Sequence, residues 1–148
     1  MTPEADASAV IPEAFRDLLS GDALATLTTM RADGTPHPTP VWIDFEDGRL
    51  LVNTRADRVK AAHMQRRPAV ALCIVDPRNP YRYLSVNGEV ESVSEDGALA
   101  HMDALARRYL RVRRYPWAAP GERRLLFRVR PTKIVADSGE VDLPEPEL

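Results

Sequence analysis

Cysteine is nearly absent from this sequence, since Cys73 is the single one among 148 residues. It excludes an internal disulfide, and because it lies in the apolar run 69–75, we expect a buried, unreactive thiol in a reducing compartment. Long apolar runs are also missing. No segment approaches the roughly 18 apolar residues of a membrane span. No basic region precedes an apolar stretch at the N-terminus, so we expect no signal peptide and a cytoplasmic protein.

An excess of charge of one sign is missing as well. The formal net charge is −2 and the pI is about 5.9, which gives no indication of nucleic-acid binding. Local basic runs do occur at 107–108 and 111–114. Such runs are typical of solvated helix ends. Alternatively, these basic side chains line a groove that binds an acidic cofactor tail or substrate.

Several motifs of known chemistry are absent. The three histidines, His37, His63 and His101, have no metal-ligand spacing, so no metal site is predicted. The patterns of serine hydrolases, dinucleotide-binding folds and P-loop proteins do not occur. The sequence therefore identifies no catalytic acid, base or nucleophile.

The length and composition fit one globular domain. With 148 residues, 44% of them hydrophobic and 28% charged, the chain can bury about two thirds of its unfolded surface. We expect a disordered lead over residues 1–10, a folded domain over 11–137, and a mobile acidic tail over 138–148.

Apolar periodicity and turn signals predict the elements of that domain. The predicted helices cover residues 11–20, 55–67 and 94–111. The last helix has Ser94 as its cap and an apolar face of Leu99, Met102, Leu105, Ala106 and Tyr109. The predicted strands cover residues 23–30, 35–45, 50–54, 69–75, 81–93 and 123–135. Their short connections favour antiparallel pairing, and six such strands favour a barrel, so the predicted fold class is mainly β with a few helices.

In two of the predicted strands, proline or glycine indicates where the strand lies in the sheet or where its pairing is irregular. Pro36, Pro38 and Pro40 alternate along 35–45, which suits an edge strand, because each lacks the N–H that a central strand needs. Gly88 predicts a β-bulge within 81–93.

The strand-to-helix junction after residue 50 contains the most informative pattern. A strand ends in Asn53 and Thr54, and a helix begins within a few residues. The cations at that junction are Arg55, Arg58 and Lys60. Backbone donors at a helix start together with cations favour an anion, most naturally a phosphate, whereas uncompensated cations there oppose the helix dipole. A solvated basic helix start is the alternative, and the residues alone leave both open.

Aromatic residues are few, at 6% of the chain, but some lie where a planar ligand could pack. Trp42 follows Pro40 and Val41 on a predicted strand, while Tyr81 and Tyr83 share one strand face. Such strands can flank a flat ring system. Core packing is the better explanation for Trp42 taken alone, and it explains Tyr81 and Tyr83 at least as well.

The order and spacing of several segments together resemble the pyridoxamine 5′-phosphate oxidase-like superfamily, and within it the B group of flavin/deazaflavin oxidoreductases. The segments are 24–29 (LATLTT), 33–42 (DGTPHPTPVW), 48–54 (GRLLVNT), Lys60, 66–72 (RRPAVAL) and 87–90 (NGEV). The resemblance covers roughly residues 11–135. It does not extend to vitamin B6 oxidation, because Arg58-Val59-Lys60 replaces the oxidase's Ser-Arg-Lys turn and the chain ends in LPEPEL instead of the oxidase's substrate-binding signature.

The resemblance implies a six-stranded split β-barrel homodimer with cofactor sites at the subunit interface. The implied phosphate contacts are Asn53, Thr54, Arg58 and Lys60. The strand of Pro40, Val41 and Trp42 would flank the isoalloxazine-type ring. Tyr81 and Tyr83 would lie near the ring and the interface.

The cofactor that this resemblance implies is the deazaflavin coenzyme F420, with FMN as the alternative. Both have a ribityl phosphate, and the anionic tail of the deazaflavin would also pair with Arg55. The composition, rich in Ala, Arg, Pro and Asp, indicates a high-GC, actinobacterial source. The expected reaction is hydride transfer between reduced cofactor and a small, electron-poor unsaturated substrate. The alternatives are an FMN-dependent oxidase or reductase and a non-catalytic carrier of flavin, deazaflavin or haem.

Overall fold

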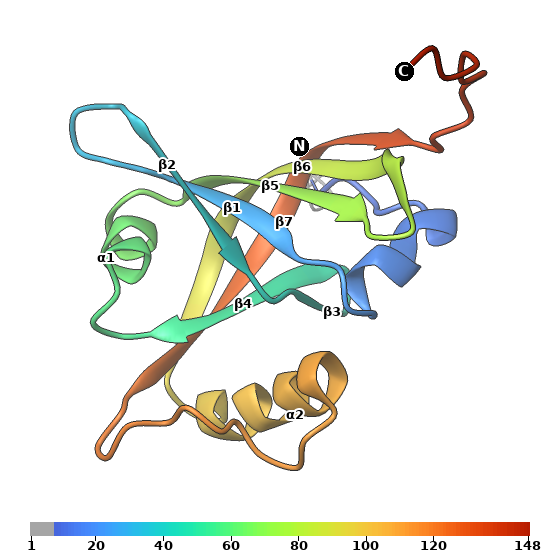
Figure 1. Ribbon diagram of the computed structural model, residues 1–148. Coiled ribbons are helices and arrows are strands. Elements are labelled where there is room, and N and C mark those ends of the chain that lie inside the picture. Colours follow the sequence, from blue (N-terminus) through green and yellow to red (C-terminus); the bar gives the residue numbers. More distant parts are fainter. Residues whose placement is uncertain (1–7) are drawn as a thin grey trace.

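The computed structural model describes residues 8–148 and is mainly β (Figure 1). Its helices are the 3-10 helix η1 (Glu13–Leu19), α1 (Val59–Arg66) and α2 (Ala98–Leu110). Its strands are β1 (Ala25–Met30), β2 (Pro36–Val41), β3 (Asp44–Glu46), β4 (Arg49–Arg55), β5 (Ala69–Asp76), β6 (Asn79–Ser94) and β7 (Arg124–Asp137). The tail 138–148 forms no helix or strand. Most of the predicted lead lies outside the described residues.

All strands belong to one antiparallel sheet in the order β2-β1-β5-β6-β7-β4-β3. The prediction of six strands was wrong, since the sheet has seven. The expected strand 35–45 is divided at Trp42 and Ile43. The Ile43 N–H donates to the Tyr109 hydroxyl at 3.0 Å, and the Ile43 carbonyl accepts from the Arg108 guanidinium. Side chains of α2 therefore bind the main-chain groups that a continuous strand would pair.

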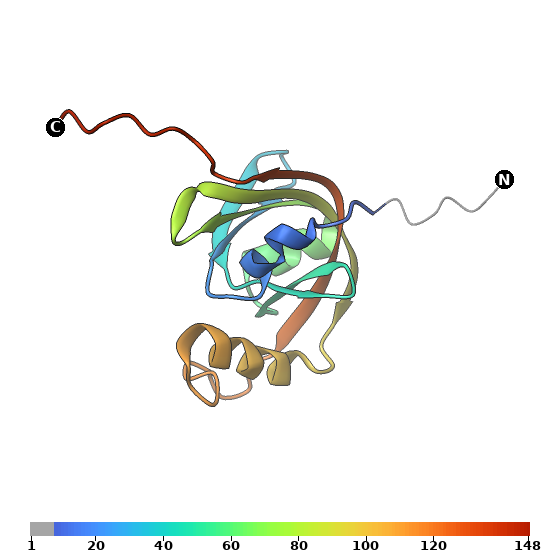
Figure 2. The ribbon, with the colours of Figure 1, turned by 90° about the vertical axis from the view of Figure 1, so that its right-hand side faces the viewer.

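The sheet curls on itself without closing. β2 and β3 are its two edges, and no ladder joins them within residues 8–148. Figure 2 shows the curled sheet with η1 across one end, and Figure 1 shows α1 at the other end and α2 to one side. The enclosed core is apolar. It includes Leu27 and Phe127 from the sheet, Ile11 and Leu19 from the N-terminal segment, and Met64 from α1.

Two predictions for single strands are confirmed. β2 pairs with β1 alone, so its alternating prolines lie on an edge strand, where missing N–H groups also hinder pairing with another chain. Gly88 lies at a register shift between β6 and β7. A Cβ atom there would lie 2.6 Å from Val129 Cγ1 and 2.8 Å from the Arg130 carbonyl oxygen, so the close approach of β7 requires glycine.

The helix boundaries differ from the prediction. α1 begins at Val59, because Arg55 is still part of β4. Ser94 ends β6 instead of capping α2, whose N-cap is Gly97 with φ 76°. The buried residues of α2 are Ala98, Met102, Leu105 and Ala106. Leu99 is 56% exposed, so its predicted place on the apolar face was wrong.

Cys73 lies on the outward face of the curled sheet. Along β5 the side chains of Val70, Leu72 and Ile74 are buried, whereas Cys73 between them is partly exposed. The prediction of a buried thiol was wrong, because β5 has one covered face and not two.

No helix in the described part of the chain is long and apolar enough to cross a membrane. Over the same residues, no three His, Cys, Asp or Glu side chains gather as a metal-binding group.

Candidate functional site

A cavity of about 540 Å³ lies among β2, β4, the start of α1 and the segment between α2 and β7. This volume falls in the usual range of small-molecule sites, about 300–1,000 Å³. Its lining residues are Leu24, Thr39, Pro40, Val41, Trp42, Asn53, Thr54, Arg55, Arg58, Lys60, Met102, Tyr115, Trp117 and Arg124. The structure thus brings together every predicted cofactor residue except Tyr81 and Tyr83.

Those two tyrosines lie elsewhere on the chain's surface. Tyr83 of β6 pairs with Val75 of β5 and Asp137 of β7, on the outward face of the sheet. Tyr81 is 52% exposed. Within one chain, neither tyrosine lines the cavity.

Arg58 and Lys60 lie at the start of α1. Among residues 8–148, neither side chain has an ion pair or a hydrogen bond. The Asp57 carboxylate interacts with the charge of Arg58 only at longer range, because it is bound to Arg55. Burial of the ammonium group, together with the nearby charge of Arg58, lowers the pKa of Lys60 below its ordinary value. An anion bound between the two side chains would offset both effects.

Arg55 is different, because it is already paired. Its Nη2 and Nε lie 2.6 Å and 3.0 Å from the two carboxylate oxygens of Asp57, and Nε lies 3.8 Å from Glu122 Oε1. The hydrogen bond with Asp57 is the main cause that raises the pKa of Arg55. Arg55 lines the cavity but does not supply the uncompensated charge that the sequence suggested.

A series of buried polar contacts connects the cavity wall to α2. Arg124 Nε donates to Glu122 Oε2 at 2.9 Å, and these side chains are 5% and 4% exposed. Arg124 Nη1 also donates to Asn53 Oδ1 at 3.4 Å. The Asn53 amide nitrogen lies 2.7 Å from the Ala98 carbonyl oxygen and 3.1 Å from His101 Nδ1.

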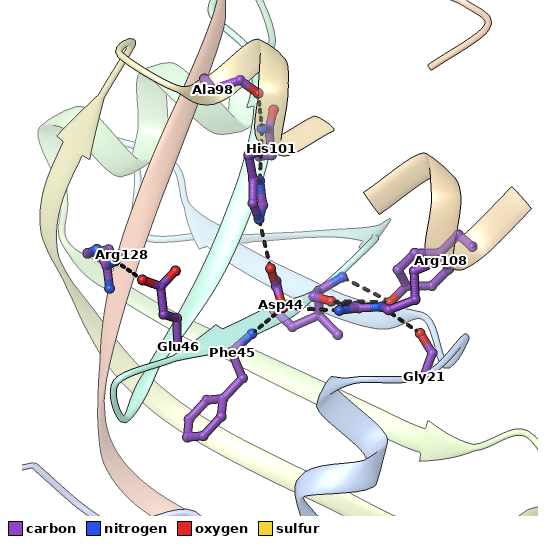
Figure 3. A network of polar contacts seen from close by, with 11 residues as sticks. Gly21, Asp44, Phe45, Glu46, Ala98, His101, Arg108 and Arg128 are labelled. Carbon is purple, nitrogen blue, oxygen red and sulfur yellow. Dashed lines mark hydrogen bonds and ion pairs between the residues drawn. The ribbon is translucent and has the colours of Figure 1, made fainter. Parts of the chain in front are cut away.

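The series continues from His101 to β3, as Figure 3 shows. His101 Nε2 lies 2.9 Å from Asp44 Oδ2, and Arg108 Nη1 donates to Asp44 Oδ1 at 3.0 Å. The Phe45 N–H donates to the same carboxylate. Burial alone would raise the pKa of Asp44. The hydrogen bonds from His101 and Phe45 and the charge of Arg108 have the opposite effect, and together they outweigh burial, so the pKa of Asp44 is lowered. Asp44 is therefore an ionised acceptor that holds His101.

A row of aromatic rings forms the apolar part of the cavity. Trp42 stacks on Tyr109 with 5.0 Å between ring centroids and 4° between planes. Tyr115 lies edge-on to Trp42 at 6.1 Å, and Trp117 lies edge-on to Tyr115 at 5.7 Å. The Arg124 guanidinium lies 4.7 Å from the centroid of the Tyr115 ring. Trp42 thus both packs against α2 and lines the site.

Sequence reasoning missed several lining residues: Leu24, Thr39, Met102, Tyr115, Trp117 and Arg124. Tyr115 and Trp117 did give a signal, because aromatic residues two positions apart follow a basic run directly. Arg124 gave none, since it begins a strand about 70 residues from its partner Asn53 in the chain.

A model of the pyridoxamine 5′-phosphate oxidase family matches residues 11–136. The chain belongs to this family. Among solved structures, a protein described as an F420 reductase shares 34% sequence identity with it, with a TM-score of 0.75. That similarity covers 84% of this chain and 98% of the reductase. At this coarse level, membership in the pyridoxamine 5′-phosphate oxidase family supports an oxidoreductase of the flavin type.

Two more distant structures share the fold of this oxidase family. The conserved hypothetical protein Rv2991 from Mycobacterium tuberculosis is 22% identical, with a TM-score of 0.72 over 100% of this chain and 97% of that one. General Stress Protein 26 from Bacillus anthracis is also 22% identical, with a TM-score of 0.64 over 84% and 92% of the two chains. No curated protein sequence matches the chain significantly.

Proposed function

We propose that the cavity binds coenzyme F420 and that the protein transfers a hydride between this cofactor and a small unsaturated organic substrate. The observation that carries the proposal is the pair Arg58 and Lys60, two cations that form no ion pair or hydrogen bond among residues 8–148, in a cavity with an aromatic wall. Cations favour a phosphate, and an aromatic wall favours a planar ring. The family match and the similarity to an F420 reductase support the same class of cofactor.

The hydroxyl group of Thr39 provides a test of fit. Its Oγ1 is buried and has no hydrogen-bond partner among residues 8–148, and Thr39 lines the cavity. A buried hydroxyl normally has a partner. The polar edge of a flavin-type ring would provide one, so the residues present fit such a cofactor.

In this proposal, Arg58 and Lys60 hold the cofactor phosphate with Thr54 beside them, and Trp42 flanks the ring. When bound, the cofactor supplies two-electron hydride chemistry. The chain binds and orients it. Tyr115 and Trp117, which border the cavity at its aromatic row, are assigned to the substrate side.

Titration of the purified protein with coenzyme F420 and with FMN tests the cofactor assignment. We expect F420 to bind and its reduced form to be oxidised faster when protein and an electron-poor enone or quinone are both present. Binding without faster oxidation would favour a carrier. Tighter binding of FMN, with turnover that depends on FMN, would favour the oxidase or reductase alternative.

We expect a preference for the deazaflavin of no more than about tenfold at low salt. Its tail carboxylates can reach exposed cations such as Arg66, and such pairs contribute only about 0.2–1 kcal/mol each. Arg55 adds little, because Asp57 already compensates it. Rising ionic strength should reduce the preference in parallel titrations. A preference that salt does not change would mean that these cations do not contact the tail.

We also propose a cytoplasmic homodimer with a cofactor site at its interface. An uncharged row of side chains crosses the outward face of four adjacent strands: Thr26, Cys73, Ser85 and Val135. Tyr83 lies two residues from Ser85 along β6, on the same face. A second copy packed on this face would cover the row, and the tyrosines of one chain could then reach the cavity of the other.

Sedimentation and thiol labelling test the dimer together. We expect a dimer at micromolar concentration and slow labelling of Cys73, because the partner would cover its partly exposed thiol. Dilution below the dissociation constant should accelerate labelling. A stable monomer at micromolar concentration would exclude the interface site.

A further inference from the structure

The amide group of Asn53 has no N–H left for a ligand. One of its two N–H groups is directed at the Ala98 carbonyl oxygen at 2.7 Å, and the other at His101 Nδ1 at 3.1 Å. Its oxygen accepts from Arg124. An acceptor oxygen repels a phosphate, so direct phosphate binding by the Asn53 side chain does not follow from these contacts.

The partners of His101 determine which of its ring nitrogens carries the proton. Asp44 is an ionised carboxylate with Arg108 beside it, and it can only accept, so Nε2–H of His101 is the donor in that contact. In the neutral ring, Nδ1 is then the acceptor that faces Asn53. A reversed Asn53 amide would place its oxygen against the Ala98 carbonyl and its N–H groups against Arg124. The network therefore permits one orientation of the amide.

We propose that His101 is a positioning residue of the cofactor site, which acts through Asn53 to hold the Arg124 guanidinium at the cavity wall. Arg124 lies between Glu122 and Asn53 and faces the Tyr115 ring. Without the acceptor at position 101, the Asn53 amide keeps only the Ala98 carbonyl as an acceptor for its N–H groups, so the amide is held less firmly and its 3.4 Å contact with Arg124 weakens. This inference rests on the proposed function, because it assigns Arg124 to the same ligand as Arg58 and Lys60.

Two substitutions separate positioning from a merely structural role. In His101→Asn, the side-chain oxygen can occupy the place of Nδ1 and accept from Asn53, but the contact with Asp44 is lost. In His101→Gln, the longer amide can donate to Asp44, but the acceptor for Asn53 is lost. We expect His101→Gln to weaken cofactor binding about five- to tenfold, and His101→Asn to stay within about twofold of the wild type although its melting temperature is lower. If His101 only ties α2 to β3, the order is reversed and His101→Asn binds worse.

A measurement without cofactor makes the test independent of the proposed function. In the unliganded protein, the side-chain amide protons of Asn53 should exchange slowly with solvent in the wild type and in His101→Asn, and rapidly in His101→Gln. If these exchange rates are equal in the two variants, the inference is wrong whatever the affinities. If the wild type binds neither F420 nor FMN while the exchange rates differ as expected, the proposed function is wrong and the control of Asn53 by His101 stands.

Discussion

Replacing both Arg58 and Lys60 with alanine should weaken binding of F420 or FMN by about a hundred- to ten-thousandfold. Each side chain is expected to form a charge-assisted contact with the cofactor phosphate, and such a contact contributes about 1.5–3 kcal/mol. One loss therefore corresponds to roughly a ten- to hundredfold change, and two nearby losses combine without strict additivity. Lys60→Ala alone should weaken cofactor binding about ten- to hundredfold. Fluorescence titration of each variant measures the effect.

The folded state should tolerate this double substitution well. Neither side chain has an ion pair or a hydrogen bond in the described part of the chain, and the unliganded protein holds Lys60 half-buried beside another cation. Removing these charges should leave the melting temperature unchanged or slightly higher. Arg66→Ala is the matched control in the FMN titration, because FMN lacks the anionic tail and Arg66 belongs to the same helix without lining the cavity. If the folded double variant binds the cofactor with wild-type affinity, Arg58 and Lys60 do not hold the cofactor phosphate.

The local parts of this site could be predicted from the sequence because their signals are local. The junction from Asn53 to Lys60 changes from strand to helix within a few residues and concentrates its cations there. Any fold that contains this junction presents those side chains together. Trp42 was found for a similar reason, since it directly follows the alternating prolines of an edge strand.

The distant parts could not be predicted, because long-range pairing places them. Arg124 reaches the site only because β7 pairs with β4, which sets Arg124 opposite Arg55. The break of the strand 35–45 has its cause in Tyr109 and Arg108 of α2, far along the chain. The sequence around Arg124 does not indicate its place in the site, and the sequence of 35–45 does not indicate the break of the strand.

Burial was mispredicted where an apolar residue was assumed to face inward. Cys73 lies in an apolar run, yet the strand alternates and the thiol faces outward. Leu99 lies next to the buried stripe of α2 but not on it. In both cases the composition of the segment was apolar, and only the neighbouring elements determine which face is covered.

Arg124→Leu should destabilise the protein by about 3 kcal/mol, at the lower end of the range for breaking a buried ion pair. The substitution leaves the Glu122 carboxylate, which is 4% exposed, without its 2.9 Å contact to Arg124 Nε. Arg55 Nε at 3.8 Å from Glu122 compensates part of the loss. Urea unfolding of the unliganded protein measures the change. The same variant should also bind the cofactor more weakly, because the guanidinium beside Tyr115 is gone.

The double variant Arg124→Leu/Glu122→Leu separates stability from binding. Replacing a buried ion pair with apolar side chains is often neutral for stability, so most of the lost free energy of unfolding should return. Cofactor affinity should stay low, because the double variant still lacks the cation at the cavity wall. Equal stability of the single and double variants would show that Glu122 is not left uncompensated. Recovery of affinity together with stability would show that Arg124 supports the fold and does not contact the cofactor.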